Sequence, residues 1–252
     1  KKAVYGLPEL YRKEIPGTPL IANPGCYATT TILALSPLVR RKWLTPGSIV
    51  VDAKSGVSGA GKKLDPMYLY CEATENFQAY AVAKHRHVPE IEQILTDQSG
   101  RAESLTFVPH LVPMTRGILV TAYGTLKKKM TTAAVRQAFE EDYGGERFIR
   151  LLPEGRWPQT KDTAGTNYVD INVTIDERNR RVVVSSTSTN RWEEVGAGTA
   201  GIAGSNRGRK QPTARLWRWH GVELPNDGRV GLYYCRGTRR PGGASGVLNL
   251  FL

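Results

Sequence analysis

Asn23-Pro24-Gly25-Cys26-Tyr27-Ala28-Thr29 is the stretch around which the rest of the chain is organised. The apolar segment before it, residues 19–22, is typical of a buried strand, and residues 30–35 after it are typical of a helix. Pro24 and Gly25 supply a sharp turn between the two. Cys26 is therefore expected at the first turn of the helix, where unpaired backbone N–H groups and the helix dipole stabilise an anion.

A cysteine at such a position is expected to have a lowered pKa and to act as a nucleophile. The alternative is a structural cysteine, because free cysteines are among the residues most often buried. The three cysteines, Cys26, Cys71 and Cys235, are widely spaced and form no CxxC pair. This spacing argues against a disulfide framework or a zinc site, and it suits a reducing cytosol.

The 252 residues carry a formal net charge of +12, and half of that excess lies after residue 185, in a segment rich in Arg and Gly. The first two-thirds show no basic stripe interleaved with aromatic residues, so nucleic-acid binding is not favoured. Positive charge also suits an anionic substrate or a phosphorylated cofactor. No stretch approaches the length of a membrane span, and the first residues lack the apolar core of a signal peptide, so we expect no membrane association.

Strand-like and helix-like segments are mixed along the chain, which predicts an α+β fold. Strands are expected at 48–52, 105–112 and 118–125, and a hairpin from 168–175 and 181–185. Helices are expected after Cys26, after Pro89 and over 131–139. Pro37 is expected to end or kink the first helix after Ser36, and residues 63–83 are expected to be irregular. After residue 186 no segment keeps a helical or strand period for long.

Of the four histidines, two can serve Cys26 as acid or base. His110 lies inside an apolar strand, and His220 lies in the irregular tail. His85 and His87 flank Arg86 just before a helix, and they point to the same side if the segment is extended. The pair lacks a third metal ligand at a convincing spacing, so acid/base service is favoured over zinc, with Glu90 three residues on to orient an imidazole. A surface His-Arg-His turn is the alternative.

Residues 55–61, Ser55-Gly56-Val57-Ser58-Gly59-Ala60-Gly61, are rich enough in glycine to let a backbone approach a ligand closely. The segment lacks the GxGxxG spacing and the helix that follows it in a dinucleotide fingerprint, so a flexible loop is the alternative. Arg116 follows a strand and is a candidate partner for a carboxylate or a phosphate, although an isolated arginine is usually a surface charge.

Five segments, taken together and in order, resemble the N-acetyl-gamma-glutamyl-phosphate reductase family, whose members form a semialdehyde in arginine biosynthesis. The resemblance covers residues 3–185. The segments are Tyr5-Gly6-Leu7-Pro8-Glu9-Leu10, Asn23-Pro24-Gly25-Cys26-Tyr27, residues 52–61, His85-Arg86-His87-Val88-Pro89-Glu90 and Pro113-Met114-Thr115-Arg116-Gly117-Ile118.

The resemblance implies a role for each motif. Cys26 would attack an acyl phosphate to give a thioester, which NADPH would reduce. His87 would be the catalytic acid or base, oriented by Glu90, and His85 would be the alternative residue for this role. The loop from Ser55 to Gly61 would bind the nicotinamide end of NADP through Ser55, Gly56, Ser58 and Gly59, with Ser58 and Gly59 nearest. Asn23 and Arg116 would bind the substrate.

The resemblance also implies the fold and the setting. Residues 1–185 would form the semialdehyde-dehydrogenase-type catalytic, or dimerisation, domain, with a mixed, largely antiparallel sheet flanked by helices. The chain would be a cytoplasmic homo-oligomer, dimer or tetramer, acting on a small acyl phosphate without a metal. The family's dinucleotide-binding turn does not precede Lys1, and residues 186–252 form an atypical Arg/Gly-rich tail where that domain would resume. We therefore expect weak or absent NADPH binding by this chain alone.

Three alternatives stay open at this point. The first is a reductase of a related acyl phosphate, aspartyl or aminoadipyl. The second is a basic fragment that binds nucleic acid through residues 186–252, which salt dependence would reveal. The third is a cysteine-dependent hydrolase, which would release an acid and need no nicotinamide.

Overall fold

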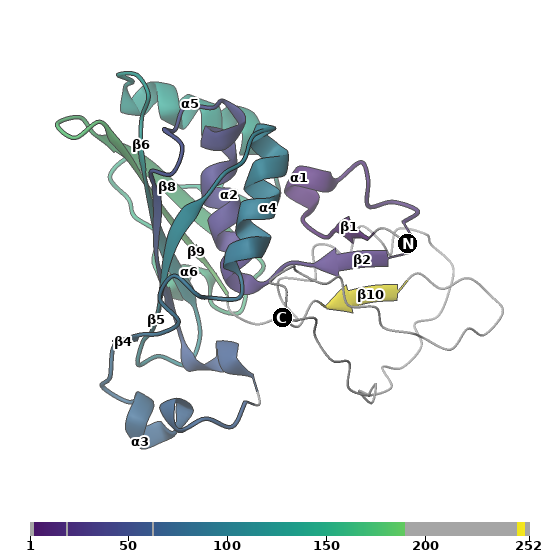
Figure 1. Ribbon diagram of the computed structural model, residues 1–252, viewed down its shortest axis with the longest axis vertical. Helices are drawn as coiled ribbons and strands as arrows, with labels where there is room; N and C mark the ends of the chain where they lie inside the picture. The colour runs from purple at the N-terminus through teal and green to yellow at the C-terminus, as the bar shows by residue number, and fades with distance from the viewer. Residues whose placement is uncertain (1–2, 19, 62, 190–245, 250–252) are drawn as a thin grey trace.

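A computed structural model of the chain describes residues 3–18, 20–61, 63–189 and 246–249, the last as backbone only (Figure 1). His220 and Cys235, both named from the sequence above, lie outside these described residues. The elements, in chain order, are β1 Val4–Tyr5, α1 Pro8–Tyr11, β2 Leu20–Asn23, α2 Cys26–Arg40, β3 Ile49–Ser55, η1 Val57–Ala60, η2 Pro66–Tyr68, α3 Tyr70–Ala73, β4 Gln78–Ala79, α4 Val88–Ser99, β5 Leu105–Leu111, β6 Ile118–Thr125, α5 Thr132–Tyr143, β7 Ile149–Leu151, α6 Thr160–Thr163, β8 Val169–Asp176, β9 Arg181–Ser188 and β10 Gly246–Asn249.

A seven-stranded sheet in the order β4-β5-β3-β6-β9-β8-β7 forms the centre of the fold. Four of its six pairings are antiparallel, and the β3–β5 and β7–β8 pairings are parallel. The prediction of an α+β fold with a mixed, largely antiparallel sheet is confirmed. The β8–β9 hairpin is also present, and β9 continues to Ser188, three residues past the predicted end of the domain at 185.

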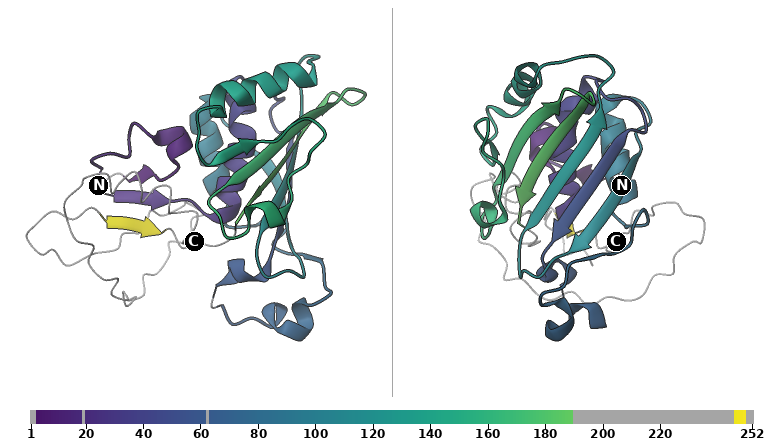
Figure 2. Two further views of the ribbon diagram at one scale, coloured as in Figure 1. Left: turned by 180° about the vertical axis from the view of Figure 1, so that it is seen from behind. Right: turned by 90° about the vertical axis from the view of Figure 1, so that its left-hand side faces the viewer.

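The helices α2, α4 and α5 cover one face of this sheet, and the views from the side show the opposite face without a helical layer over its central strands (Figure 2). The strands beneath the helices alternate in burial, as expected for side chains that point to opposite faces. Val51, Phe107, Val120 and Val184 point into the core and are fully buried. No helix among the described residues is long and apolar enough to cross a bilayer.

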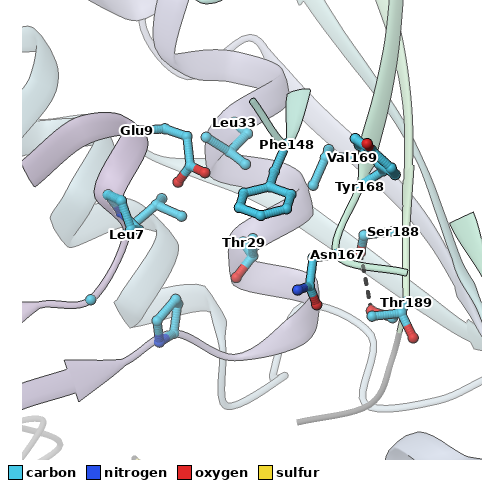
Figure 3. Close-up of a pocket in the computed structure, with 13 residues that line it drawn as sticks. Leu7, Glu9, Thr29, Leu33, Phe148, Asn167, Tyr168, Val169, Ser188 and Thr189 are labelled. Atoms are coloured by element: carbon cyan, nitrogen blue, oxygen red, sulfur yellow. Dashed lines mark hydrogen bonds between the residues drawn. The ribbon is translucent and has the colours of Figure 1, made fainter. Parts of the chain in front are cut away.

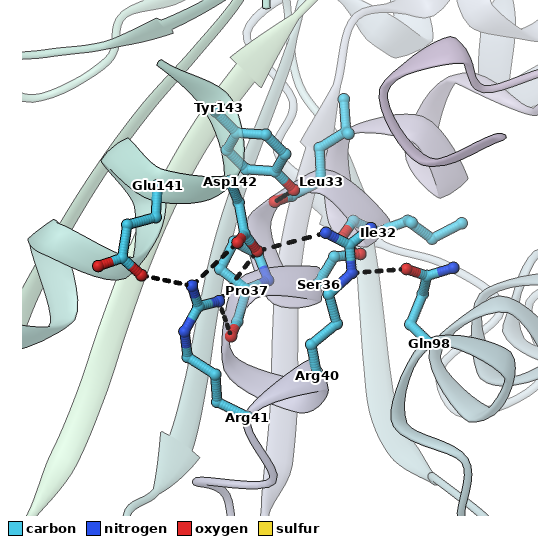
Figure 4. Close-up of polar contacts among 10 residues, drawn as sticks. All are labelled: Ile32, Leu33, Ser36, Pro37, Arg40, Arg41, Gln98, Glu141, Asp142 and Tyr143. Atoms are coloured by element: carbon cyan, nitrogen blue, oxygen red, sulfur yellow. Dashed lines mark hydrogen bonds and ion pairs between the residues drawn. The ribbon is translucent and has the colours of Figure 1, made fainter. Parts of the chain in front are cut away.

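Helix α2 runs through Pro37, so the helix does not end at Ser36, which was one of the two predicted effects of this proline. A proline inside a helix leaves the carbonyl four residues earlier without its N–H donor. Here that carbonyl belongs to Leu33, and the buried hydroxyl of Tyr143 in α5 donates to it at 2.7 Å (Figure 4). A donor 110 residues away along the chain thus replaces the missing helical bond.

An ion-pair network holds the C-terminal end of α2 against its neighbours (Figure 4). The Arg41 guanidinium donates to both oxygens of Asp142 in α5, at 3.0 and 2.9 Å, and to Glu141 at 2.9 Å. Arg40 donates to Gln98 of α4 at 2.7 Å. Cations at a helix C-terminus also favour the helix dipole, so the network fixes α2 from the end opposite Cys26.

A smaller, three-stranded sheet supports the other end of α2. β2 pairs in parallel with β1 on one side and with β10 on the other. β10 is a strand within the tail, which the sequence did not predict. β2 ends at Asn23, and the chain turns directly into α2.

Residues 63–83 contain three short elements, η2, α3 and β4, where irregular structure was predicted. The other helix predictions are confirmed. α4 begins at Val88 and ends before Gly100, which has φ +67°. The Thr131 side chain caps α5 by accepting from the Ala134 N–H at 3.2 Å, and the helix runs on to Tyr143.

Candidate active site

The corner between β2 and α2 has the predicted form, with Gly25 as the N-cap and Cys26 as the first helical residue. Gly25 is needed there because the imidazole of His87 lies directly against it. A methyl group in place of the glycine hydrogen would lie 2.5 Å from Nε2 of His87. The glycine therefore permits the close approach of a histidine to the residue before Cys26.

Cys26 is 5% exposed, and its thiol has a pKa raised to about 11. Burial is the main cause, because it disfavours the thiolate. The backbone N–H groups of Tyr27 and Cys26 and the charge of Arg86 act in the opposite direction. The prediction of a lowered pKa was wrong, since the helix N-terminus stabilises the thiolate as expected but desolvation outweighs that effect. A neutral thiol needs a base to react.

His87 occupies the N-cap position of α4, where its side chain makes no capping hydrogen bond, and it is almost fully buried. Burial, followed by His85 and Arg86, lowers its pKa to about 3. Nδ1 of His87 has no hydrogen-bond partner among the described residues. The ring is therefore neutral near pH 7 and retains the capacity to accept a proton.

His85 is also buried, with a pKa lowered to about 4, first by burial and then by Arg86. Its Nδ1 accepts the backbone N–H of His87 at 3.2 Å, and the two rings lie 4.9 Å apart. Tyr27 packs edge-on against His85 at 5.5 Å and against His87 at 6.2 Å. The structure thus brings both candidate histidines to the Cys26 corner, with His87 against Gly25 and His85 against Tyr27.

Glu90 lies at the corner but contacts other groups than the one we expected. Its Oε1 accepts the Gly25 N–H at 3.1 Å and the Tyr5 hydroxyl at 2.8 Å. The hydrogen bonds described for Glu90 and His87 do not join these two side chains, so the expected orientation of an imidazole by Glu90 is not seen. Burial raises the pKa of this carboxyl. Sequence reasoning missed Tyr5, although the residue stands in the first of the five resembling segments.

The glycine-rich loop packs against the loop that carries Arg116. The backbone N–H groups of Gly56, Val57 and Ser58 donate to the carbonyls of residues 117, 114 and 115 respectively, each at 3.0 Å. A Cβ at Gly56 would lie 2.8 Å from backbone atoms of that second loop. The Ser55 hydroxyl bonds to the Gly56 carbonyl, and Ser58 and Gly59 are half-buried. This firmly packed loop differs from the flexible loop that was the alternative.

The two predicted substrate-binding residues differ in their surroundings. Arg116 is exposed on its loop. Asn23 is fully buried at the end of β2, and within the described part of the chain neither its amide nitrogen nor its amide oxygen has a hydrogen-bond partner. A buried amide without hydrogen-bond partners costs free energy of folding, so the Asn23 side chain is suited to bind a ligand.

A cavity of about 30 Å³ adjoins the corner on the side of Pro24 and Thr29 (Figure 3). None of the predicted site residues lines it. Its lining is Gly6, Leu7, Pro8, Glu9, Pro24, Thr29, Leu33, Phe148, Asn167, Tyr168, Val169, Ser188 and Thr189. Elsewhere in the described ranges, no group of three His, Cys, Asp or Glu side chains is placed to hold a metal ion.

The semialdehyde dehydrogenase dimerisation-domain family model matches residues 26–190. The chain is 50% identical over 188 residues to the N-acetyl-gamma-glutamyl-phosphate reductase of Desulforamulus reducens, and 51% identical over 191 residues to that of Symbiobacterium thermophilum. Each match covers 75% of this chain, but only 54% and 55% of the respective relative. The chain thus spans a little over half the length of these curated relatives.

Solved structures of aspartate semialdehyde dehydrogenases have a similar fold. The enzyme II of Vibrio cholerae, complexed with ASA, aligns with a TM-score of 0.59 and 14% identity, over 81% of this chain and 68% of that one. The enzyme of Francisella tularensis aligns with a TM-score of 0.59 and 9% identity, over 79% and 70%. At such low identity the likeness concerns the fold alone.

Proposed function

Because the chain belongs to the semialdehyde dehydrogenase dimerisation-domain family, we propose that it is the catalytic domain of an N-acetyl-gamma-glutamyl-phosphate reductase of arginine biosynthesis. The observation that carries this proposal is the contact of a neutral, buried His87 with the residue preceding Cys26. Residues 1–185 are the catalytic part in this proposal, and residues 186–252 are an atypical tail.

The proposed first step is acyl transfer to Cys26. The sulfur forms a bond to the acyl carbon of the acyl phosphate, the bond from that carbon to the phosphate oxygen breaks, and inorganic phosphate leaves. The thiol proton becomes acidic as the carbon–sulfur bond forms, and it then passes through the neutral His87 imidazole to the departing phosphate. The backbone N–H groups at the start of α2 stabilise the negative charge that develops beside Cys26.

The glycine-rich loop uses its backbone donors within the protein. The backbone donors of Gly56, Val57 and Ser58 are already bonded to the loop of residues 114–117, and Gly59 donates to the Gly56 carbonyl. NADPH, as the proposed hydride donor, would supply the reduction of the thioester to the semialdehyde. Ser55, Gly56, Ser58 and Gly59 are the residues proposed to lie along its nicotinamide end, with Ser58 and Gly59 nearest.

Substrate, assembly and location are part of the same proposal. Arg116 and Asn23 would hold the anionic and polar groups of the acyl phosphate. The family's description as a dimerisation domain supports a homo-oligomer. The names of the relatives, which are biosynthetic reductases, support action in the cytoplasm.

Phosphate release tests the proposal without any need for the cofactor. Mixed with N-acetyl-gamma-glutamyl phosphate, the chain should release one phosphate per molecule in a burst. Cys26→Ala should abolish the burst, Cys71→Ala should keep it, and His87→Gln should slow it by about 10²- to 10⁴-fold. A burst that persists in Cys26→Ala contradicts the proposed role of this thiol. A larger burst with aspartyl or aminoadipyl phosphate would reassign the substrate within the class.

A further inference from the structure

We propose that Tyr5 is a positioning residue that acts on Cys26 through Glu90. The inference rests on the proposed function, because Cys26 matters here as the nucleophile. Tyr5 lies on β1 in the three-stranded sheet, whereas Glu90 lies in the first turn of α4. One carboxylate oxygen of Glu90 joins the Tyr5 hydroxyl to the backbone N–H of Gly25.

The Tyr5–Glu90 hydrogen bond is partly buried. Glu90 is 8% exposed, and its bond to Gly25 is buried. Tyr5 is fixed further by the ring of Tyr11, which packs edge-on at 5.9 Å. Hydrogen bonds to a buried carboxylate are among the stronger ones in proteins, so removal of one donor alters the state of the carboxylate.

Glu90 affects Cys26 in two ways. It fixes the backbone of Gly25, the residue before the thiol, and its negative charge opposes formation of the thiolate. Tyr5 and Gly25 both favour the ionised carboxylate, against the effect of burial. Without the Tyr5 hydroxyl, Glu90 loses one of the two hydrogen bonds that favour its ionised form, so its pKa rises further and its opposition to the thiolate is weakened.

The remaining titratable and charged groups around the pair come from three other segments. Arg86 precedes α4 and favours both the thiolate and the Glu90 carboxylate, and Tyr27 and Tyr80 interact electrostatically with Cys26. His85 and His87 are neutral near pH 7 because burial lowers the pKa of each. Tyr5→Phe changes none of these side chains, so its effect on the thiol is expected to pass through Glu90.

The pH dependence of Cys26 alkylation by iodoacetamide tests this link, with the Cys26 peptide followed by mass spectrometry. Tyr5→Phe should move the midpoint to lower pH and raise the alkylation rate at pH 8 about threefold or more, which corresponds to about half a pH unit. Tyr11→Phe is the matched control, since its hydroxyl bonds Asp97 at the surface, and it should leave the midpoint unchanged.

The decisive comparison uses Glu90→Gln, which keeps the shape but carries no charge. If Tyr5 acts through Glu90, Tyr5→Phe should have no further effect in the Glu90→Gln background. An equal shift in both backgrounds, an upward shift, or no shift overturns the proposal. Alkylation needs neither acyl phosphate nor cofactor. A failure of the Tyr5 proposal is therefore distinguishable from a missing phosphate burst, which bears on the proposed function. Thermal melts confirm that each variant is folded.

Discussion

His87 links the chemistry of the site to the stability of the fold. A buried, neutral histidine binds fewer protons in the folded chain than in the unfolded chain between the unfolded pKa, about 6.5, and the folded pKa, about 3. The unfolded state binds the additional proton throughout this window. The contribution of His87 therefore makes the folded state less stable as the pH falls through it.

The first prediction follows from that difference in proton binding. The free energy of unfolding, measured by urea titration, should fall as the pH is lowered from 6.5 to 4. In the His87→Gln variant this free energy should fall less steeply, because glutamine does not titrate. Glu90, whose pKa is raised, is unchanged in both proteins and does not affect the comparison. An identical pH slope in the two proteins would show that His87 is not buried in the neutral form.

At the level of α2, the Tyr143 hydroxyl compensates for Pro37. Tyr143→Phe should destabilise the chain by about 1–3 kcal/mol, because it leaves the buried Leu33 carbonyl without a donor. Tyr123→Phe, on the half-buried face of β6, is the control for the loss of a tyrosine hydroxyl. Equal changes in the denaturant midpoint of the two variants would contradict the compensating role.

Helix α2 also shows which features of the fold the sequence alone predicts. The turn at Pro24-Gly25, the helix start at Cys26 and the β8–β9 hairpin depend on local patterns, and they were predicted. The sequence does not decide whether α2 ends at Pro37 or continues through it, because the donor that replaces the missing helical bond comes from Tyr143 in another helix. The raised pKa of Cys26 was missed for a similar reason, since burial depends on the packing of the whole domain.

The partners of Glu90 show the same limit in the candidate site. Its spacing from His87 suggested an imidazole as its partner. In the folded chain, Glu90 lies in the first turn of α4, and its carboxylate accepts hydrogen bonds from Gly25 and Tyr5 instead. The sequence therefore identified most of the residues that meet at the corner, whereas their pairwise contacts required the fold.

For the whole molecule, the packing of the loop at residues 55–61 predicts weak cofactor binding by this chain. Its backbone donors at residues 56–59 are engaged within the protein, so we expect no saturable enhancement of NADPH fluorescence in a titration up to millimolar concentration. Saturation at micromolar NADPH would show that the chain carries a dinucleotide site that the described residues do not reveal.

Direct detection of a thioester tests whether Cys26 accepts the acyl group. The chain should be incubated with N-acetyl-gamma-glutamyl phosphate in the absence of NADPH, quenched in acid and digested for peptide mass spectrometry. We expect one N-acetylglutamyl adduct on the peptide that contains Cys26, and hydroxylamine should remove it. An adduct on Cys71 alone, or full phosphate release with Cys26 unmodified at every time point, would contradict this role of Cys26.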